Sequence, residues 1–244
     1  MNNLSDASSN IIALLGFKLA SRPADDEHPY GHGRFEYLSG LAVAVMIVVI
    51  GIELLRSSID KIANPDPADF SFVAVGILLM SIAVKLWMAV FNKKIGTRIS
   101  STTLLATAAD SRNDVIATAA VLICAIISAA TDFDLDGWAG LAVSAFIIYS
   151  GITLVKDATD PLLGRAPDPD LVEHVRNKIM SYPGVLGMHD LIIHDYGPGR
   201  RLCSFHAEVP QDADILEAHD AIDHIEREIQ EKFGIETTAH MDPI

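Results

Sequence analysis

Long apolar runs separated by short polar loops dominate the first two thirds of the chain. A helix needs about 20 apolar residues to cross a bilayer, and four runs meet this need at residues 35–58, 70–92, 103–130 and 135–156. A fifth run, residues 11–20, is too short, because about 22 Å of helix separates Asp6 from the polar turn at Ser21. We therefore predict four spans, and we expect membrane sequence to precede Met1 in the intact protein.

The last third of the chain has the pattern of a small water-soluble domain. Helices are predicted at residues 169–181, with Asp168 as N-cap, and from Asp212 or Asp214 to residue 233. Strands are predicted at residues 185–196, 201–210 and 235–241, the first two joined by a Gly-Pro-Gly turn. This order predicts an α+β ferredoxin-like domain (αββαβ) over residues 164–244, following an α-helical membrane bundle over residues 1–163.

Charge is spread unevenly over these two parts. The 244 residues are 50% hydrophobic and carry a net charge of −14, yet residues 166–244 alone hold 16 acidic and 6 basic side chains. The sequence has no basic patch that could neutralise phosphates, so we expect no nucleic-acid partner. The two cysteines, Cys124 and Cys203, exclude a disulfide framework and a thiolate metal cluster, and fit a reducing compartment.

The basic residues of the loops predict the orientation in the membrane. They gather on one side, in loops 21–34 and 92–101 and at the exit from the last span (Arg22, Arg34, Lys93, Lys94, Arg98, Lys156 and Arg165). The opposite side has Arg56 and Lys61 in one loop and only acids in the other. By the positive-inside rule the C-terminal domain is cytoplasmic, and the chain is a multi-pass protein of the cell membrane.

Two carboxylates, Asp110 and Asp114, lie four residues apart at the start of an apolar run, and therefore on one helix face. Each ionised carboxylate in a bilayer costs about 2.5–3.5 kcal/mol, so the pair indicates a bound cation. Asn2 and Asp6 repeat the spacing at the head of another apolar stretch, although they are also explained as a frayed helix end. Four oxygen ligands without sulfur or imidazole favour a hard divalent ion such as Mn²⁺.

Two further groups contain histidine. Asp25, His28 and His32 lie in the loop between two spans and form either a metal site or a tight turn with solvated histidines. In the C-terminal domain, strand alternation places His206 on a polar face while Cys203, Phe205 and Ala207 point inward. His240 and Asp242 share a face in the last strand. The alternative for all these histidines, which include His189 and His219, is a solvated surface without metal.

Several motifs together resemble the cation diffusion facilitator family. They are the loop 23–36 (PADDEHPYGHGRFE), the D-x-x-x-D pair at Asp110 and Asp114, and the segments 187–191 (GMHDL) and 240–243 (HMDP). The family exports divalent metals from the cytoplasm in exchange for protons. The resemblance implies six spans, a homodimer formed through the cytoplasmic domain, and three groups of metal ligands: a transport site (Asn2, Asp6, Asp110 and Asp114), a loop site (Asp25, His28 and His32) and cytoplasmic sites (His189, His206, His219, His240 and Asp242).

Two positions depart from the family pattern. Zinc-type members have a histidine in the transport site, whereas Asn2 in the first position resembles the manganese-type branch. Gly164 stands where an aspartate often precedes the equivalent of Arg165, which removes an expected charge contact at the dimer seam.

The expected function is Mn²⁺ export by proton antiport, with the metal as substrate and regulator rather than as a prosthetic group. The alternatives are export of Zn²⁺ or Fe²⁺, with Co²⁺ and Cd²⁺ also in range, and a membrane fragment that binds metal without transport. An enzyme is not expected, since the metalloprotease motif H-E-x-x-H is missing from the sequence.

Overall fold

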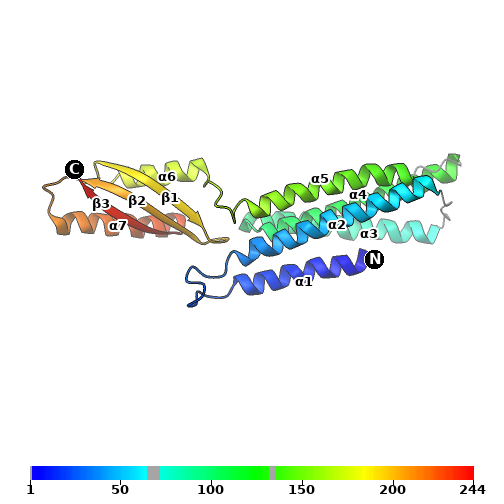
Figure 1. Ribbon diagram of the computed structural model, residues 1–244, viewed down its shortest axis with the longest axis horizontal. Coiled ribbons are helices and arrows are strands. Elements are labelled where there is room, and N and C mark those ends of the chain that lie inside the picture. The colour runs from blue at the N-terminus through cyan, green and yellow to red at the C-terminus, as the bar shows by residue number, and fades with distance from the viewer. Residues whose placement is uncertain (1, 65–71, 132–135) are drawn as a thin grey trace. The chain divides into compact units, whose positions relative to one another are not determined.

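The computed structural model describes residues 2–64, 72–131 and 136–244, with side chains from residue 8 onward except at 72–74, 125, 128–131 and 136 (Figure 1). These residues form two compact units. One holds the residues up to Ala20 together with Phe35–Asp160, and the other holds Ser21–Arg34 together with Pro161–Ile244. The predicted fold class, a helical membrane bundle and a cytoplasmic αββαβ domain, is confirmed.

The first unit consists of five helices: α1 (Asn2–Ala20), α2 (Phe35–Ala63), α3 (Phe72–Ile99), α4 (Thr102–Thr131) and α5 (Asp136–Thr159). Three described segments are long and apolar enough to cross a membrane: Phe35–Ala63, Val75–Ile99 and Gly137–Thr159. The predicted span 103–130 forms α4, whose first half carries the charged residues Asp110, Arg112 and Asp114. The short apolar run 11–20 lies in α1.

Close packing of α2 along α5 organises this unit, while α3 lies along α4 and α1 lies against α2 and α4. Glycine permits the approach of α2 to α5. A Cβ atom added at Gly51 would lie 2.8 Å from a side-chain carbon of Ile148, and one added at Gly151 would lie 2.7 Å from Val48. Small residues at such contacts are how helices associate in lipid, where the hydrophobic effect gives no help.

The C-terminal domain contains α6 (Pro169–Met180), β1 (Gly187–Asp195), β2 (Arg201–Val209), α7 (Ile215–Phe233) and β3 (Ile235–Pro243). The predicted cap of the first helix is confirmed, because the Asp168 carboxylate accepts a bond from the Asp170 amide. Of the two candidate starts for the second helix, Asp214 is the cap, accepting from the amides of Leu216 and Glu217. The helix ends at Gly234 with a positive φ of 65°.

The three strands lie in the order β1-β2-β3, with β1 antiparallel and β3 parallel to β2. Cys203, Phe205 and Ala207 are buried, as the alternation predicts, and pack with helix residues such as Ile179 and Ile225. The odd positions of β2 therefore face the two helices. The even positions, His206 among them, lie on the opposite face of the sheet.

Candidate metal sites

The carboxylates of Asp110 and Asp114 each contact a different neighbouring helix. The Ser9 hydroxyl of α1 donates to Asp110 Oδ2 at 3.2 Å, and Lys85 Nζ of α3 lies 2.8 Å from Asp114 Oδ2. The α4 pair therefore lies at a meeting point of three helices. Asn2 and Asp6 belong to α1, but their side chains lie outside the described residues.

Lys85 is the residue of this site that the sequence analysis missed. It lies in the middle of an apolar span, and the side chains of Lys85 and Asp114 are each only 18% exposed. A lone lysine in a span is rare, and it normally pairs with an acid or faces a polar cavity. This rule singles out Lys85 in the sequence as a residue that needs a partner. Hydrophobic periodicity could not identify that partner, because Asp114 lies 29 positions away on another helix.

Two of the three residues between the aspartates, Arg112 and Asn113, have different surroundings from the aspartates. The Arg112 guanidinium donates to the Ser150 hydroxyl at 2.9 Å and lies 5.6 Å from the Phe146 ring centre, both on α5. Asn113 is buried, and neither polar atom of its amide has a hydrogen-bond partner among the described residues. The aspartates thus face α1 and α3, while Arg112 faces α5.

The loop group forms a compact cluster. One ligand atom from each of Asp25, His28 and His32 lies within 4.8 Å of the other two. His28 is half exposed, whereas only 6% of the His32 side chain is exposed. The alternative of two solvated histidines is therefore excluded for His32.

A contact with a backbone carbonyl sets the tautomer of His32. His32 Nδ1 lies 3.0 Å from the carbonyl oxygen of Pro23, and since a carbonyl only accepts, Nδ1 carries the hydrogen. In the neutral ring this leaves a lone pair on Nε2, which lies 3.5 Å from Asp25 Oδ2. Bonding the second ring nitrogen to a carbonyl is the common way to orient a metal-binding histidine.

The same loop packs on the β1–β2 hairpin of the C-terminal domain. The Tyr30 ring stacks on Tyr196 with a centroid separation of 4.6 Å. The Arg34 guanidinium donates to the carbonyl of Asp195 at 2.8 Å and lies 4.4 Å from the Tyr196 ring centre. The loop therefore belongs structurally to the C-terminal domain, although the sequence places it between two membrane helices.

A second cluster lies on the open face of the sheet. Asp242 Oδ2 lies 2.9 Å from His206 Nδ1 and 3.0 Å from His189 Nε2. His240 joins from β3, with its Nε2 atom 3.5 Å from Asp242 Oδ1 and its ring 4.9 Å from that of His206. His219 lies outside this group, on α7, where it contacts Asp223.

Strand register explains why these histidines meet. His189 pairs with His206, and His206 pairs with His240, so the three rings form a row across the sheet. The register then shifts between His189 and Ile192, where Asp190 adopts a positive φ of 52°. Such bulges re-aim side chains, and this one brings the Asp190 carboxylate within 3.3 Å of His189 Nδ1.

Proton affinities in both clusters follow from these contacts. The bond from the His28 amide is the main reason that the pKa of Asp25 lies below its usual value. The bond from His206 lowers the pKa of Asp242, and the contact with Asp190 raises the pKa of His189. The two carboxylates therefore keep their charge to lower pH than usual and His189 holds a proton more tightly, so protons and a metal ion would compete for His189.

Known proteins are similar over the whole chain. Residues 1–163 match the cation efflux transmembrane domain, and residues 167–244 match the cytoplasmic domain of cation efflux proteins. An uncharacterised transporter of Methanocaldococcus jannaschii is 30% identical over 90% of this chain and 77% of its own length. The cation-efflux pump FieF of Yersinia enterocolitica is 28% identical over 100% of this chain and 81% of its own length.

A solved structure of CzrB corresponds to one part of the chain. It is 30% identical, with a TM-score of 0.31, and the match covers 32% of this chain and 99% of that one. The family assignment rests on the two domain matches, which together account for nearly every residue. The chain belongs to the cation efflux, or cation diffusion facilitator, family of membrane transporters, with its C-terminal domain in the cytoplasm.

Proposed function

We propose that this cation efflux protein exports Mn²⁺ from the cytoplasm in exchange for protons, using Asp110 and Asp114 as central ligands. The observation that carries the proposal is the position of these two carboxylates, on one face of α4 and in contact with α1 and α3. Two carboxylates at the junction of three helices offset the charge of a divalent ion that lipid would reject.

We assign the remaining transport ligands to α1. Ser9 contacts Asp110, so α1 passes beside α4 at this level. Asp6 precedes Ser9 by three residues in the same helix, and residues three apart lie on one face. Asn2 lies one further turn away and would add a neutral oxygen ligand.

Because the ligands are carboxylates, protons can replace the metal ion before the transporter returns to its cytoplasm-facing state. The ion binds to ionised carboxylates from the cytoplasm, a conformational change exposes the site to the other side, and protons replace the metal there. Protonated carboxyl groups then return at lower charge cost than ionised ones. The oxygen-only ligand set favours Mn²⁺, with Zn²⁺ and Fe²⁺ as the second candidates.

Lys85 has a defined role in this cycle. Its ammonium lies 2.8 Å from Asp114, where it neutralises one of the two carboxylates of the proposed site. A metal ion that uses Asp114 must displace the ammonium, since two cations cannot share one oxygen without strong repulsion. We assign Lys85 as a tethered counter-ion that leaves Asp114 when metal enters.

The loop and sheet clusters are proposed as regulatory metal sites. Asp25, His28 and His32 offer one set, and His189, His206 and Asp242 offer another, with His240 adjacent. Metal bound in this acidic domain would reduce its negative charge and favour the association of two protomers, as a homodimer, through residues 164–244.

Metal flux in proteoliposomes tests the proposal. Wild-type protein should carry Mn²⁺ against its gradient when a proton gradient is imposed, and Asp110→Ala should abolish the flux. A protein that binds Mn²⁺ but shows no flux would favour the alternative, a metal-binding membrane protein without transport. Retention of flux in the variant would exclude Asp110 as a ligand.

A further inference from the structure

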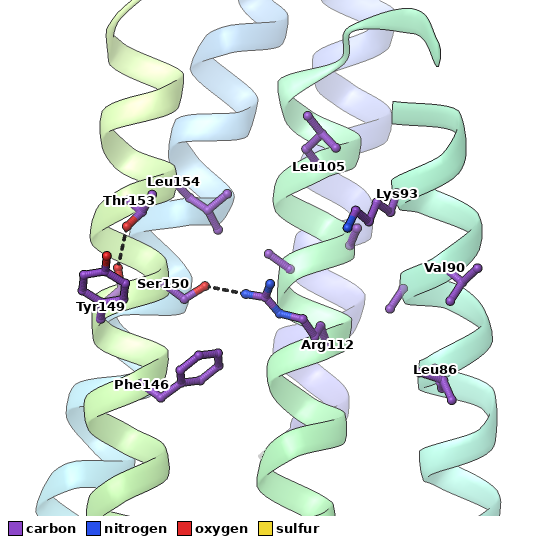
Figure 2. A pocket seen from close by; sticks show the side chains of 13 residues that line it. Leu86, Val90, Lys93, Leu105, Arg112, Phe146, Tyr149, Ser150, Thr153 and Leu154 are labelled. Atoms are coloured by element: carbon purple, nitrogen blue, oxygen red, sulfur yellow. Dashed lines mark hydrogen bonds between the residues drawn. The ribbon is translucent and has the colours of Figure 1, made fainter. Parts of the chain in front are cut away.

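A cavity of about 560 Å³ opens between α3, α4 and α5 (Figure 2). Its walls are mainly aliphatic and aromatic, with Leu86 and Val90 on α3 and Phe146 on α5. Two cationic side chains, Lys93 and Arg112, also line it. No described residue of the lining carries a carboxylate.

The charge of Arg112 is not balanced within the described part of the chain. Its guanidinium contacts the Ser150 hydroxyl and the Phe146 ring, and neither Arg112 nor Lys93 forms an ion pair with a described carboxylate. Arg112 lies ten residues into α4, about 15 Å along the helix from its start. A guanidinium at this depth in a membrane costs several kcal/mol unless an anion or water reaches it.

The two cations lie at different depths in the cavity, with Lys93 closer to the cytoplasm than Arg112. α5 leads into the cytoplasmic domain, so its Thr159 end is cytoplasmic. Lys93 and Leu105 line the cavity together with Thr153 and Leu154, near the turn between α3 and α4. Figure 2 shows Lys93 near this end, Arg112 deeper in the cavity at about the level of Val90, and Leu86 and Phe146 farther still from the cytoplasmic end. The cavity thus has Lys93 and hydroxyl groups toward its cytoplasmic end, Arg112 deeper within it, and apolar side chains at its inner end.

We propose that this cavity binds an anionic phospholipid of the cytoplasmic leaflet. The lipid phosphate would lie between Lys93 and Arg112, and an acyl chain would lie along Leu86, Val90 and Phe146. The occupant follows from charge complementarity, since basic pockets between membrane helices on the cytoplasmic side bind anionic headgroups. A zwitterionic lipid would bring a cationic group to a place that already holds two cations, Lys93 and Arg112.

Native mass spectrometry of the full chain in detergent tests this site, with phosphatidylglycerol and phosphatidylcholine of identical acyl chains as probes. We expect one tightly held phosphatidylglycerol per protomer and at least tenfold weaker retention of phosphatidylcholine. Lys93→Ala and Arg112→Gln should each lower phosphatidylglycerol affinity about fivefold. Lys94→Ala is the matched control, because Lys94 is an exposed neighbour outside the cavity, and its affinity should equal that of the wild type.

Three results would overturn the proposal. Equal retention of the two lipids would show that the headgroup charge is not recognised. An equal loss in Lys94→Ala would show a general attraction to basic residues instead of a site. Displacement by soluble glycerol phosphate at the same concentration would show a small-anion site rather than a lipid site. Lys93→Ala alters an exposed side chain, so the test does not depend on how Arg112→Gln folds.

Discussion

Lys85 Nζ lies 2.8 Å from Asp114 Oδ2, and this ion pair joins α3 to α4 at the level of the proposed transport site. The carboxylate that should attract a metal ion is therefore already neutralised by the protein itself. Because both side chains are largely shielded from water, the attraction between them is stronger than in a surface pair. We therefore expect metal entry at the proposed site to be coupled to the release of Lys85.

Replacing Lys85 with Met should strengthen Mn²⁺ binding and weaken the metal-free fold. Removal of the competing ammonium should increase affinity about tenfold, which corresponds to about 1.4 kcal/mol. The partly buried Asp114 charge loses this cation in the variant, so the melting temperature without metal should fall and should recover on addition of Mn²⁺. Calorimetric titration and thermal melts of detergent-solubilised protein measure both effects.

Lys85→Arg is the matched control for this substitution, since it retains the charge at a similar length. We expect its Mn²⁺ affinity to stay within about threefold of the wild type. Unchanged or weaker metal binding in Lys85→Met would contradict the role of Lys85 as a competing counter-ion. The assignment of Asp110 and Asp114 as ligands would be unaffected by that result.

Ser9→Ala should reduce transport moderately, whereas Asp110→Asn should remove it. The Ser9 hydroxyl orients Asp110 through one bond of 3.2 Å, and the loss of such a bond costs about 1 kcal/mol, or about fivefold. Asp110→Asn keeps the shape of the side chain but removes a charged ligand, so flux should fall at least a hundredfold. Initial rates of Mn²⁺ uptake into proteoliposomes separate the two, and equal rates for both variants would contradict the proposed ligand role.

Asp110→His should shift the preferred metal from Mn²⁺ toward Zn²⁺. Imidazole is a softer ligand than carboxylate, and zinc accepts it readily in a tetrahedral site. Competition between the two metals in the flux assay gives the ratio of their transport rates in wild type and variant. An unchanged ratio would mean that ligand hardness does not set the preference of this site.

In the cytoplasmic domain, His206→Ala and Asp242→Ala should each remove one bound metal ion per protomer. Asp242 contacts both His189 and His206, so its loss breaks the cluster even though both histidines remain. His219→Ala is the control, because this exposed side chain lies on α7, outside the cluster. The number of metal ions bound per protomer, measured on the full chain, tests this prediction. An equal loss of bound metal in His219→Ala and His206→Ala would contradict a site formed by His189, His206 and Asp242.

Local signals predicted much of this structure, and contacts between distant segments account for what they missed. The cap at Asp168 and the inward positions Cys203 and Phe205 follow from short-range rules of capping and alternation, and both are confirmed. The pairing of Lys85 with Asp114 depends on how two helices pack, which periodicity does not contain. The bulge after His189 was also missed, because the alternation of inward and outward residues assumes that two strands pair without a shift in register.

The burial of Cys203 predicts a thiol that resists modification until the domain unfolds. Burial raises the pKa of this thiol from 9.0 to about 11, and only 4% of the residue is exposed. Because thiolate is the reactive form, labelling at pH 9 should be at least fiftyfold slower in the folded than in the unfolded protein. The unfolded thiol ionises first, so as pH rises from 9 to 11 this group should progressively lower the free energy of unfolding. Labelling rates in a Cys124→Ser background, with and without denaturant, test the prediction, and rapid labelling of the folded protein at pH 9 would show that Cys203 is accessible.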